Sequence, residues 1–149
     1  MALSVAAGTE TLHGYSFGLL DGTQDLIFGA QHHIYTVLSI IAYCRAIGTA
    51  GDTATIQILG NNNHVTGTAQ TMIIAKYVCV ATETFVWNDK FSFNGYEPSG
   101  TAVLSAAVQI LNAAQGGSAV QELQFDMTSS DDGGQDYNIM TTYLDQDWT

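Results

Sequence analysis

Residues 32–47 carry the strongest structural signal in the chain. β-Branched and aromatic side chains occupy both alternating positions of this run, and they are Ile34, Tyr35, Val37, Leu38, Ile40, Ile41 and Tyr43. Such residues favour the pleated environment of a sheet. A strand that is apolar in both phases of the alternation is typical of one covered on both faces. The glycines of residues 48–51 end the run. We therefore predict a central strand that is buried on both sides.

Shorter runs of the same kind follow, each bounded by turn residues. We predict further strands at residues 12–17, 25–28, 53–59, 71–81, 121–127 and 137–144. Asp21-Gly22, residues 60–63 and residues 131–134 are rich in Gly, Asn and Asp, which tolerate the backbone conformations of turns. Residues 103–111 fit a helix and a strand equally well. Several short strands without a long amphipathic helix indicate an all-β chain, a single β-sandwich or jelly-roll-like domain.

Residues 1–30 differ from the rest because small residues separate their apolar ones. They form either the first strands of the domain or an extended N-terminal arm, and residues 31–149 form the β-sandwich domain. The N-terminus lacks the basic region of a signal peptide, and no apolar stretch is long enough to span a bilayer. We expect the chain to be used on the cytoplasmic side of its cell, or to leave by lysis.

Charge excludes several classes of partner. The chain of 149 residues has three basic and fourteen acidic side chains, with a net charge of -11. Binding of DNA or RNA needs cations that neutralise phosphates, and an anionic membrane surface has the same requirement. Thr, Gly, Asn, Gln and Ser replace the missing charge. A polar, weakly charged surface of this kind suits a protein that packs against neighbouring subunits.

Cysteine and histidine offer little chemistry in this sequence. Cys44 and Cys79 lie in apolar, strand-like runs, where two buried free thiols are favoured over a pair in adjacent strands. His32 and His33 are adjacent, so on a strand they point to opposite faces and make a poor chelate. The sequence shows no nucleophile elbow and no phosphate-binding loop. We expect neither an enzyme nor a histidine metal site.

The acidic C-terminal third contains one possible cation site. Asp131, Asp132 and Asp136 surround two glycines and supply the oxygen ligands that calcium prefers. The segment lacks the full loop and terminal Glu of an EF-hand. A solvated hairpin tip therefore remains the favoured interpretation, with calcium as the alternative.

Four aromatic residues share one face of residues 85–93. Phe85, Trp87, Phe91 and Phe93 take this face, and the other face takes Asn88, Lys90, Ser92 and Asn94. This pattern favours a sandwich core over a sugar-stacking platform. Asp89 interrupts the apolar face, so we expect a turn, a bulge or a local ion pair there.

The central stretch, residues 35–111, resembles a pattern of small virion proteins. A long hydrophobic strand (35–46) leads to an amphipathic one (53–59), a strand ending in a threonine-containing turn (73–81 and 84–87), an Asn-Asp-Lys step (88–90) and an aromatic strand (91–93). It is similar to the small β-sandwich structural proteins of tailed bacteriophages, of the capsid decoration (cement) type.

That resemblance implies a non-enzymatic homotrimer on the outer surface of the major capsid protein lattice. The virion would be assembled in the host cytoplasm. The expected docking residues are the apolar ones of the first thirty positions, Tyr15, Phe17, Leu19, Leu20, Leu26, Ile27 and Phe28. A tail or head-fibre accessory protein and a carbohydrate-binding β-sandwich module are the alternatives, and a polysaccharide hydrolase comes third.

Overall fold

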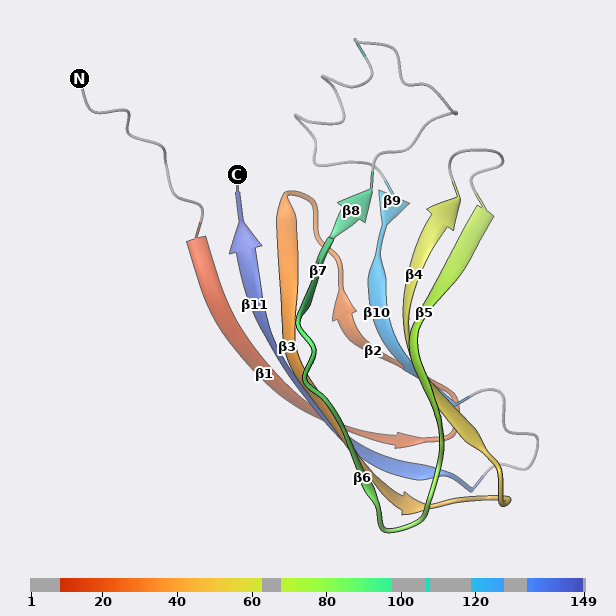
Figure 1. The fold of residues 1–149 in the computed structure, drawn as a ribbon. Helices are drawn as coiled ribbons and strands as arrows, with labels where there is room; N and C mark the ends of the chain where they lie inside the picture. Colours follow the sequence, from red (N-terminus) through yellow and green to blue (C-terminus); the bar gives the residue numbers. More distant parts are fainter. Residues whose placement is uncertain (1–8, 63–67, 98–106, 108–118, 128–133, 149) are drawn as a thin grey trace.

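The computed structural model describes residues 9–62, 68–97, 107, 119–127 and 134–148, and these residues form two packed antiparallel sheets (Figure 1). Sheet A runs from β1 (Thr9–Leu20) through β11 (Asp136–Asp147) and β3 (His33–Ala46) to β6 (Thr84–Trp87) and β7 (Phe91–Asn94), which both pair with β3. Sheet B runs from β2 (Thr23–Phe28) through β10 (Glu122–Asp126) and β4 (Thr53–Asn62) to β5 (Thr68–Val78). A small sheet joins β8 (Tyr96–Glu97) to β9 (Ala119–Val120).

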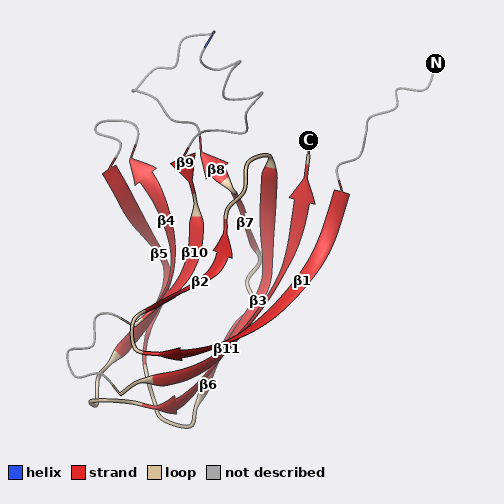
Figure 2. Ribbon diagram, turned by 180° about the vertical axis from the view of Figure 1, so that it is seen from behind, coloured by secondary structure: helices blue, strands red, loops and turns tan. Residues whose placement is uncertain are grey.

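The pairing pattern is that of a jelly roll. The β4–β5 hairpin lies innermost in sequence, and around it β3 pairs with β6 and β7, β2 with β10, and β1 with β11. The chain therefore behaves as one long antiparallel ribbon that is folded over into two sheets. This confirms the predicted all-β sandwich. Viewed from the opposite side, the same described residues are almost entirely strand (Figure 2). They contain no helix that is long and apolar enough to cross a membrane.

The first strands belong to the sandwich and do not project from it. β1 pairs with β11 along twelve consecutive residues, and β2 pairs with β10 in the other sheet. Residues 9–28 therefore do not form an extended arm, which corrects that expectation. β1 is an edge strand of sheet A, and β2 is an edge strand of sheet B. The position of residues 1–8 lies outside the described part of the chain.

The corner between β1 and β2 is held by one carboxylate. Asp21 and Gly22 have positive φ angles of 45° and 96°, which confirms the predicted turn. The Asp21 carboxylate accepts hydrogen bonds from the backbone N–H groups of Gly134 and Gln135, both at 2.9 Å. These bonds tie the corner to the segment that enters β11.

Several strands are longer than the sequence predicts. β1 continues on both sides of residues 12–17, and β4 passes through the glycine and asparagines at 60–62 that predict a turn. Long antiparallel partners supply hydrogen bonds to residues with low strand propensity, and this overrides local preference. The ambiguous segment 103–111 lies outside the described residues, apart from Ala107.

The core lies between the two sheets and takes side chains from nearly every strand. Its fully buried members include Val37 and Ile40 of β3, Ile56 of β4, Phe125 of β10 and Ile139 of β11. The four aromatic residues at 85–93 pack on this core, as predicted, with Phe93 buried and the other three partly buried. β6 and β7 are interrupted at residues 88–90, so the irregularity expected around Asp89 is present.

Candidate functional site

The outer face of sheet A carries apolar side chains that no described part of the chain covers. β3 is apolar in both phases, but only the side chains that point toward sheet B, such as Val37, Ile40 and Ala42, are buried. Tyr43, on the opposite face, is 37% exposed. The expectation that this strand is covered on both faces is therefore wrong for the described residues, because sheet B covers one side only.

The register places these outer side chains in rows across the sheet. One row contains Ser16, Met140, Ile41 and Val86, on β1, β11, β3 and β6 in that order. Met140 is 50% exposed and Val86 is 53% exposed. The neighbouring row contains Gly18, Asn138, Tyr43 and Thr84. Leu12 and Leu20 lie on the same face near the two ends of β1, at 66% and 72% exposure.

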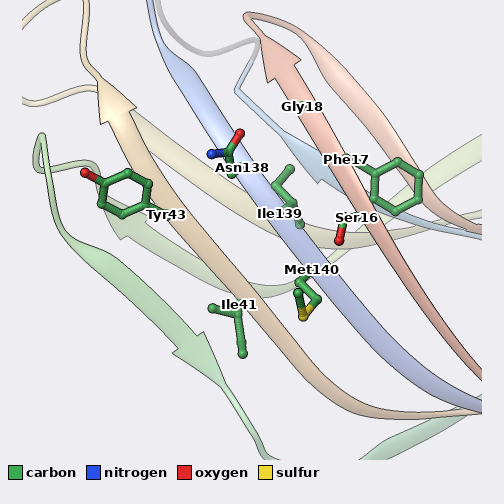
Figure 3. A pocket seen from close by; sticks show the side chains of 8 residues that line it. All are labelled: Ser16, Phe17, Gly18, Ile41, Tyr43, Asn138, Ile139 and Met140. Atoms are coloured by element: carbon green, nitrogen blue, oxygen red, sulfur yellow. The ribbon is translucent and has the colours of Figure 1, made fainter.

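A shallow groove of about 520 Å³ lies on this face (Figure 3). It is lined by Ser16, Phe17, Gly18, Ile41, Tyr43, Asn138, Ile139 and Met140. An added Cβ at Gly14 or Gly18 would meet no atom within 4 Å. The small residues of β1 therefore leave open space beside the larger side chains of β11 and β3.

The same face is free of charge between its margins. At one end the Arg45 guanidinium lies 3.3 Å from the Asp136 carboxylate, and at the other end Gln146 donates to Glu10 at 2.7 Å. Among the described residues between these two pairs, β1, β11, β3 and β6 present only uncharged side chains outward. An uncharged face agrees with the weakly charged surface that the composition indicates, since only 11% of the residues are charged.

Sheet B presents a different outer face. Gln57 donates to Gln124 at 3.1 Å, and Gln124 donates to Asp25 at 2.9 Å and to Glu122 at 3.2 Å. Partial burial and the nearby Asp25 charge raise the pKa of Glu122, while the hydrogen bond from Gln124 lowers it. The polar groups of this face are largely satisfied by one another, and its acids repel negatively charged partners. Ile73 and Val78 of β5 are exposed apolar side chains on the same face, at 52% and 57%.

The seven predicted docking residues divide between core and surface. Leu19, Leu26 and Ile27 are buried in the chain's own core, and Phe17 packs against it. Tyr15, Leu20 and Phe28 are exposed at 46%, 72% and 63%. The first group has little surface left for a neighbour. For the exposed three docking stays a prediction, and of these Leu20 lies on the outer face of sheet A.

Two histidines meet one carboxylate at the inner side of sheet A. His33 Nδ1 lies 2.6 Å from Asp145 Oδ1, and His13 Nε2 lies 3.7 Å from Asp145 Oδ2. The rings of His13 and Tyr143 are 5.2 Å apart. Among the described residues no group of three or more His, Cys, Asp or Glu side chains is arranged to hold a metal ion. His32 lies in the turn before β3, with a φ of 64°, and its ring is edge-on to that of Trp148 at 4.8 Å. The two histidines therefore diverge because the strand begins at His33, and not because both lie on one strand as expected.

A second polar cluster is buried between the sheets. Cys44 and Cys79 are free thiols at 2% exposure, and both lie close to the Tyr137 hydroxyl, which also contacts Tyr77. Burial raises the pKa of the Cys79 thiol, and the nearby Tyr137 hydroxyl has a smaller opposing effect. The neutral thiol is therefore favoured at neutral pH, and thiolate chemistry is disfavoured.

The acidic segment remains largely outside the described residues. Asp131 and Asp132 belong to residues 128–133, which are not described, while Asp136 is paired with Arg45. The calcium alternative therefore stays a prediction.

The residues of the outer face were not singled out from sequence. Ile41, Tyr43, Val86 and Met140 read as ordinary apolar strand positions, and alternation alone does not reveal which face a second sheet covers. The one sequence feature that could have indicated this exposed face is the apolar character of both alternating phases in residues 32–47.

Comparisons with known proteins return only remote likenesses. No family model matches the sequence, and no curated protein matches it. The infectious bursal disease virus Gx strain structure aligns at a TM-score of 0.42 and 11% identity over 97% of this chain and 35% of that chain. The T=1 particles derived from the same virus align at 0.43 and 10% identity over 97% and 34%. The T13 particle aligns at 0.30 and 9% identity over 98% and 43%. The chain thus spans about a third to under half of those chains, and these values assign no family.

Proposed function

We propose that this chain is a structural protein of a virus particle, of the capsid decoration kind. It binds the outer surface of a shell built from a major capsid protein, and it acts by adhesion without chemistry. The observation that carries the proposal is the outer face of sheet A, where exposed Val86, Met140 and Tyr43 lie on a surface without charge. Isolated apolar side chains on a surface are ordinary, whereas several exposed ones gathered on one uncharged face indicate a partner.

Apolar burial, electrostatic repulsion and avidity together favour adhesion through the outer face of sheet A over adhesion through other surfaces of the chain. Burial of apolar surface contributes about 25 cal/mol per Å² before the costs of association are subtracted. Repulsion between negatively charged copies is screened beyond about 8 Å at physiological ionic strength, so contact has to occur where charges are absent. Repetition of one weak contact over a lattice adds avidity. The jelly-roll topology is compatible with this role, since viral capsid domains use it, although lectins and cupins do too.

A carbohydrate-binding module is the second candidate, for one specific reason. Tyr43 lines the groove together with Asn138 and Ser16, and an aromatic ring with amide and hydroxyl groups is a typical sugar-binding combination. The four aromatic residues at 85–93 do not support this function, because they pack against the core. Binding on a glycan array that is lost in Tyr43→Ala would favour the module over the shell protein.

The first test is the abundance of the chain in virus particles purified from the lysate in which it is made. Quantitative mass spectrometry gives its ratio to the major shell protein. A ratio near that of a lattice component supports decoration, a few copies per particle indicates a tail or head-fibre part, and absence from particles contradicts the proposal.

The second test locates the contact. Undecorated particles are incubated with the recombinant chain and sedimented. Met140→Lys and Val86→Lys place charge on the outer face of sheet A and are expected to lower occupancy at least tenfold. Ile73→Lys places the same charge at a similarly exposed apolar residue on β5 of sheet B and serves as the matched control, since Ile73 is 52% exposed. Loss of occupancy in the control alone would place the contact on sheet B instead.

A further inference from the structure

β1 forms one edge of sheet A, and the features of this edge favour pairing with another strand. An exposed edge presents unpaired backbone N–H and C=O groups, and proteins normally guard such edges with short strands, bulges, Lys or Pro. β1 is twelve residues long, its register with β11 is unbroken, and it contains neither Lys nor Pro. No described segment pairs with its outer side.

The other sheet edges are guarded. β5 carries Lys76 and faces a register shift at Ile56/Gln57. β2 has six residues, an acidic Asp25 and a register shift in its pairing with β10. The edge opposite β1 in sheet A is split into β6 and β7, with Asp89 and Lys90 between them. β1 carries one acidic residue, Glu10, near its N-terminal end, but of the described edges of sheets A and B it alone has no break, no register shift and no Lys.

The sequence of β1 is symmetric about Ser16. On the outer face the strand reads Leu12, Gly14, Ser16, Gly18 and Leu20, which has the same residues in both directions. On the inner face Tyr15 and Phe17 flank the same centre. Consider a two-fold axis that is perpendicular to the sheet and passes midway between Ser16 of the two copies. It would place Leu12 opposite Leu20 of the second copy, Gly14 opposite Gly18, and Tyr15 opposite Phe17.

Charge favours this register between two copies of an acidic chain. The single ionised side chain of β1, Glu10, would face Gly22 of the second copy. The two Glu10 carboxylates would be about 40 Å apart at roughly 3.4 Å per residue along the strands, well beyond the screening length. Interfaces with two-fold symmetry require a self-complementary surface, and this strand provides one.

We propose that β1 pairs antiparallel with β1 of a second copy, centred on Ser16, so that two copies of sheet A form one continuous sheet. The outer faces of the two sheets then lie side by side and double the uncharged surface. The pairing does not depend on the proposed function, since it concerns an edge and its partner is the chain itself. Under this proposal two copies form a dimer, whereas the resemblance implies a trimer.

The register is tested by disulfide trapping. Directly opposed residues of antiparallel strands have Cα atoms about 4.5–5.5 Å apart, within the range that a disulfide spans. Ser16→Cys is therefore expected to give a covalent dimer when glutathione disulfide is the oxidant. Gly14→Cys is the matched control, because its Cβ has open space and its counterpart in the second copy would lie about 14 Å away at four residues' separation. The native thiols are buried in the same protein and are expected to form no cross-link.

The mass in solution completes the test. Size-exclusion chromatography with light scattering is expected to give twice the chain mass of 15.9 kDa at roughly 0.1 mM. Ser16→Lys places like charges directly opposite each other and is expected to shift the protein to monomer with an unchanged circular dichroism spectrum. Val86→Lys, on the same face but the opposite edge, leaves the dimer intact. A monomeric or trimeric wild type, or equal cross-linking of both cysteine variants, would overturn the proposal.

Discussion

Two adjacent residues of β11 test whether the two faces of sheet A differ as described. Ile139 points toward sheet B and is 1% exposed, while Met140 points outward and is 50% exposed. Changing either residue to Ala removes side-chain atoms of similar number from the same strand. The difference in destabilisation therefore reports the difference between the faces.

The expected magnitudes follow from burial. Ile139→Ala loses about 0.8 kcal/mol for each of three buried carbon groups, and a cavity term brings the total to about 3–4 kcal/mol. Met140→Ala loses contacts on only one side and leaves no closed cavity, so we expect about 1 kcal/mol or less. At about 4 °C per kcal/mol for a domain of this size, the shifts in Tm are about 12–16 °C and at most about 4 °C.

Urea unfolding followed by tryptophan fluorescence measures both changes, with circular dichroism as the second probe of a two-state transition. The control is Thr141→Ser, a small change at a buried position of the same strand. Equal destabilisation by Ile139→Ala and Met140→Ala would refute the conclusion that the outer face is uncovered in the isolated chain.

Three further outcomes are expected. Gly29→Ala places a Cβ against the backbone oxygens of residues 95 and 121 and is expected to cost about 2–3 kcal/mol in urea unfolding, whereas Gly14→Ala has open space and costs less than about 1 kcal/mol. Burial, and secondly the charges of neighbouring tyrosines and Asp145, raise the pKa of Tyr143 to about 12. The contribution of this group to the free energy of unfolding is therefore fully present below its unfolded pKa of about 10, and it is lost as the pH rises to about 12. Tyr143→Phe should flatten that part of a stability–pH profile, and an unchanged profile contradicts the assignment. A thiol reagent should label Cys44 and Cys79 only in denaturant, so rapid labelling of the folded chain would show that these cysteines are accessible.

Local pattern predicted much of the fold because strand alternation and turn chemistry are local properties. Asp21 and Gly22 turn where the sequence indicates, and the alternation of Phe85 and Trp87 places both rings on the core side. Strand lengths were harder to predict, since Gly14 and Gly18 have low strand propensity and are held in β1 by their pairing with β11.

The candidate surface required the three-dimensional arrangement. Leu19, Leu20, Leu26 and Phe28 are similar apolar residues in the sequence, yet Leu19 and Leu26 fill the core while Leu20 and Phe28 are exposed. A period of two assigns each side chain to one face or the other. It carries no information on which face another part of the chain will cover.

The sequence by itself determined that the chain is all β, that it turns at Asp21 and Gly22, and that residues 32–47 are apolar on both faces. Only the tertiary structure decided that one of those faces stays uncovered among the described residues and that β1 forms an unguarded edge. The physical reason is that strand propensity and alternation act over a few residues, whereas coverage and edges depend on pairings such as β1 with β11, more than a hundred residues apart along the chain.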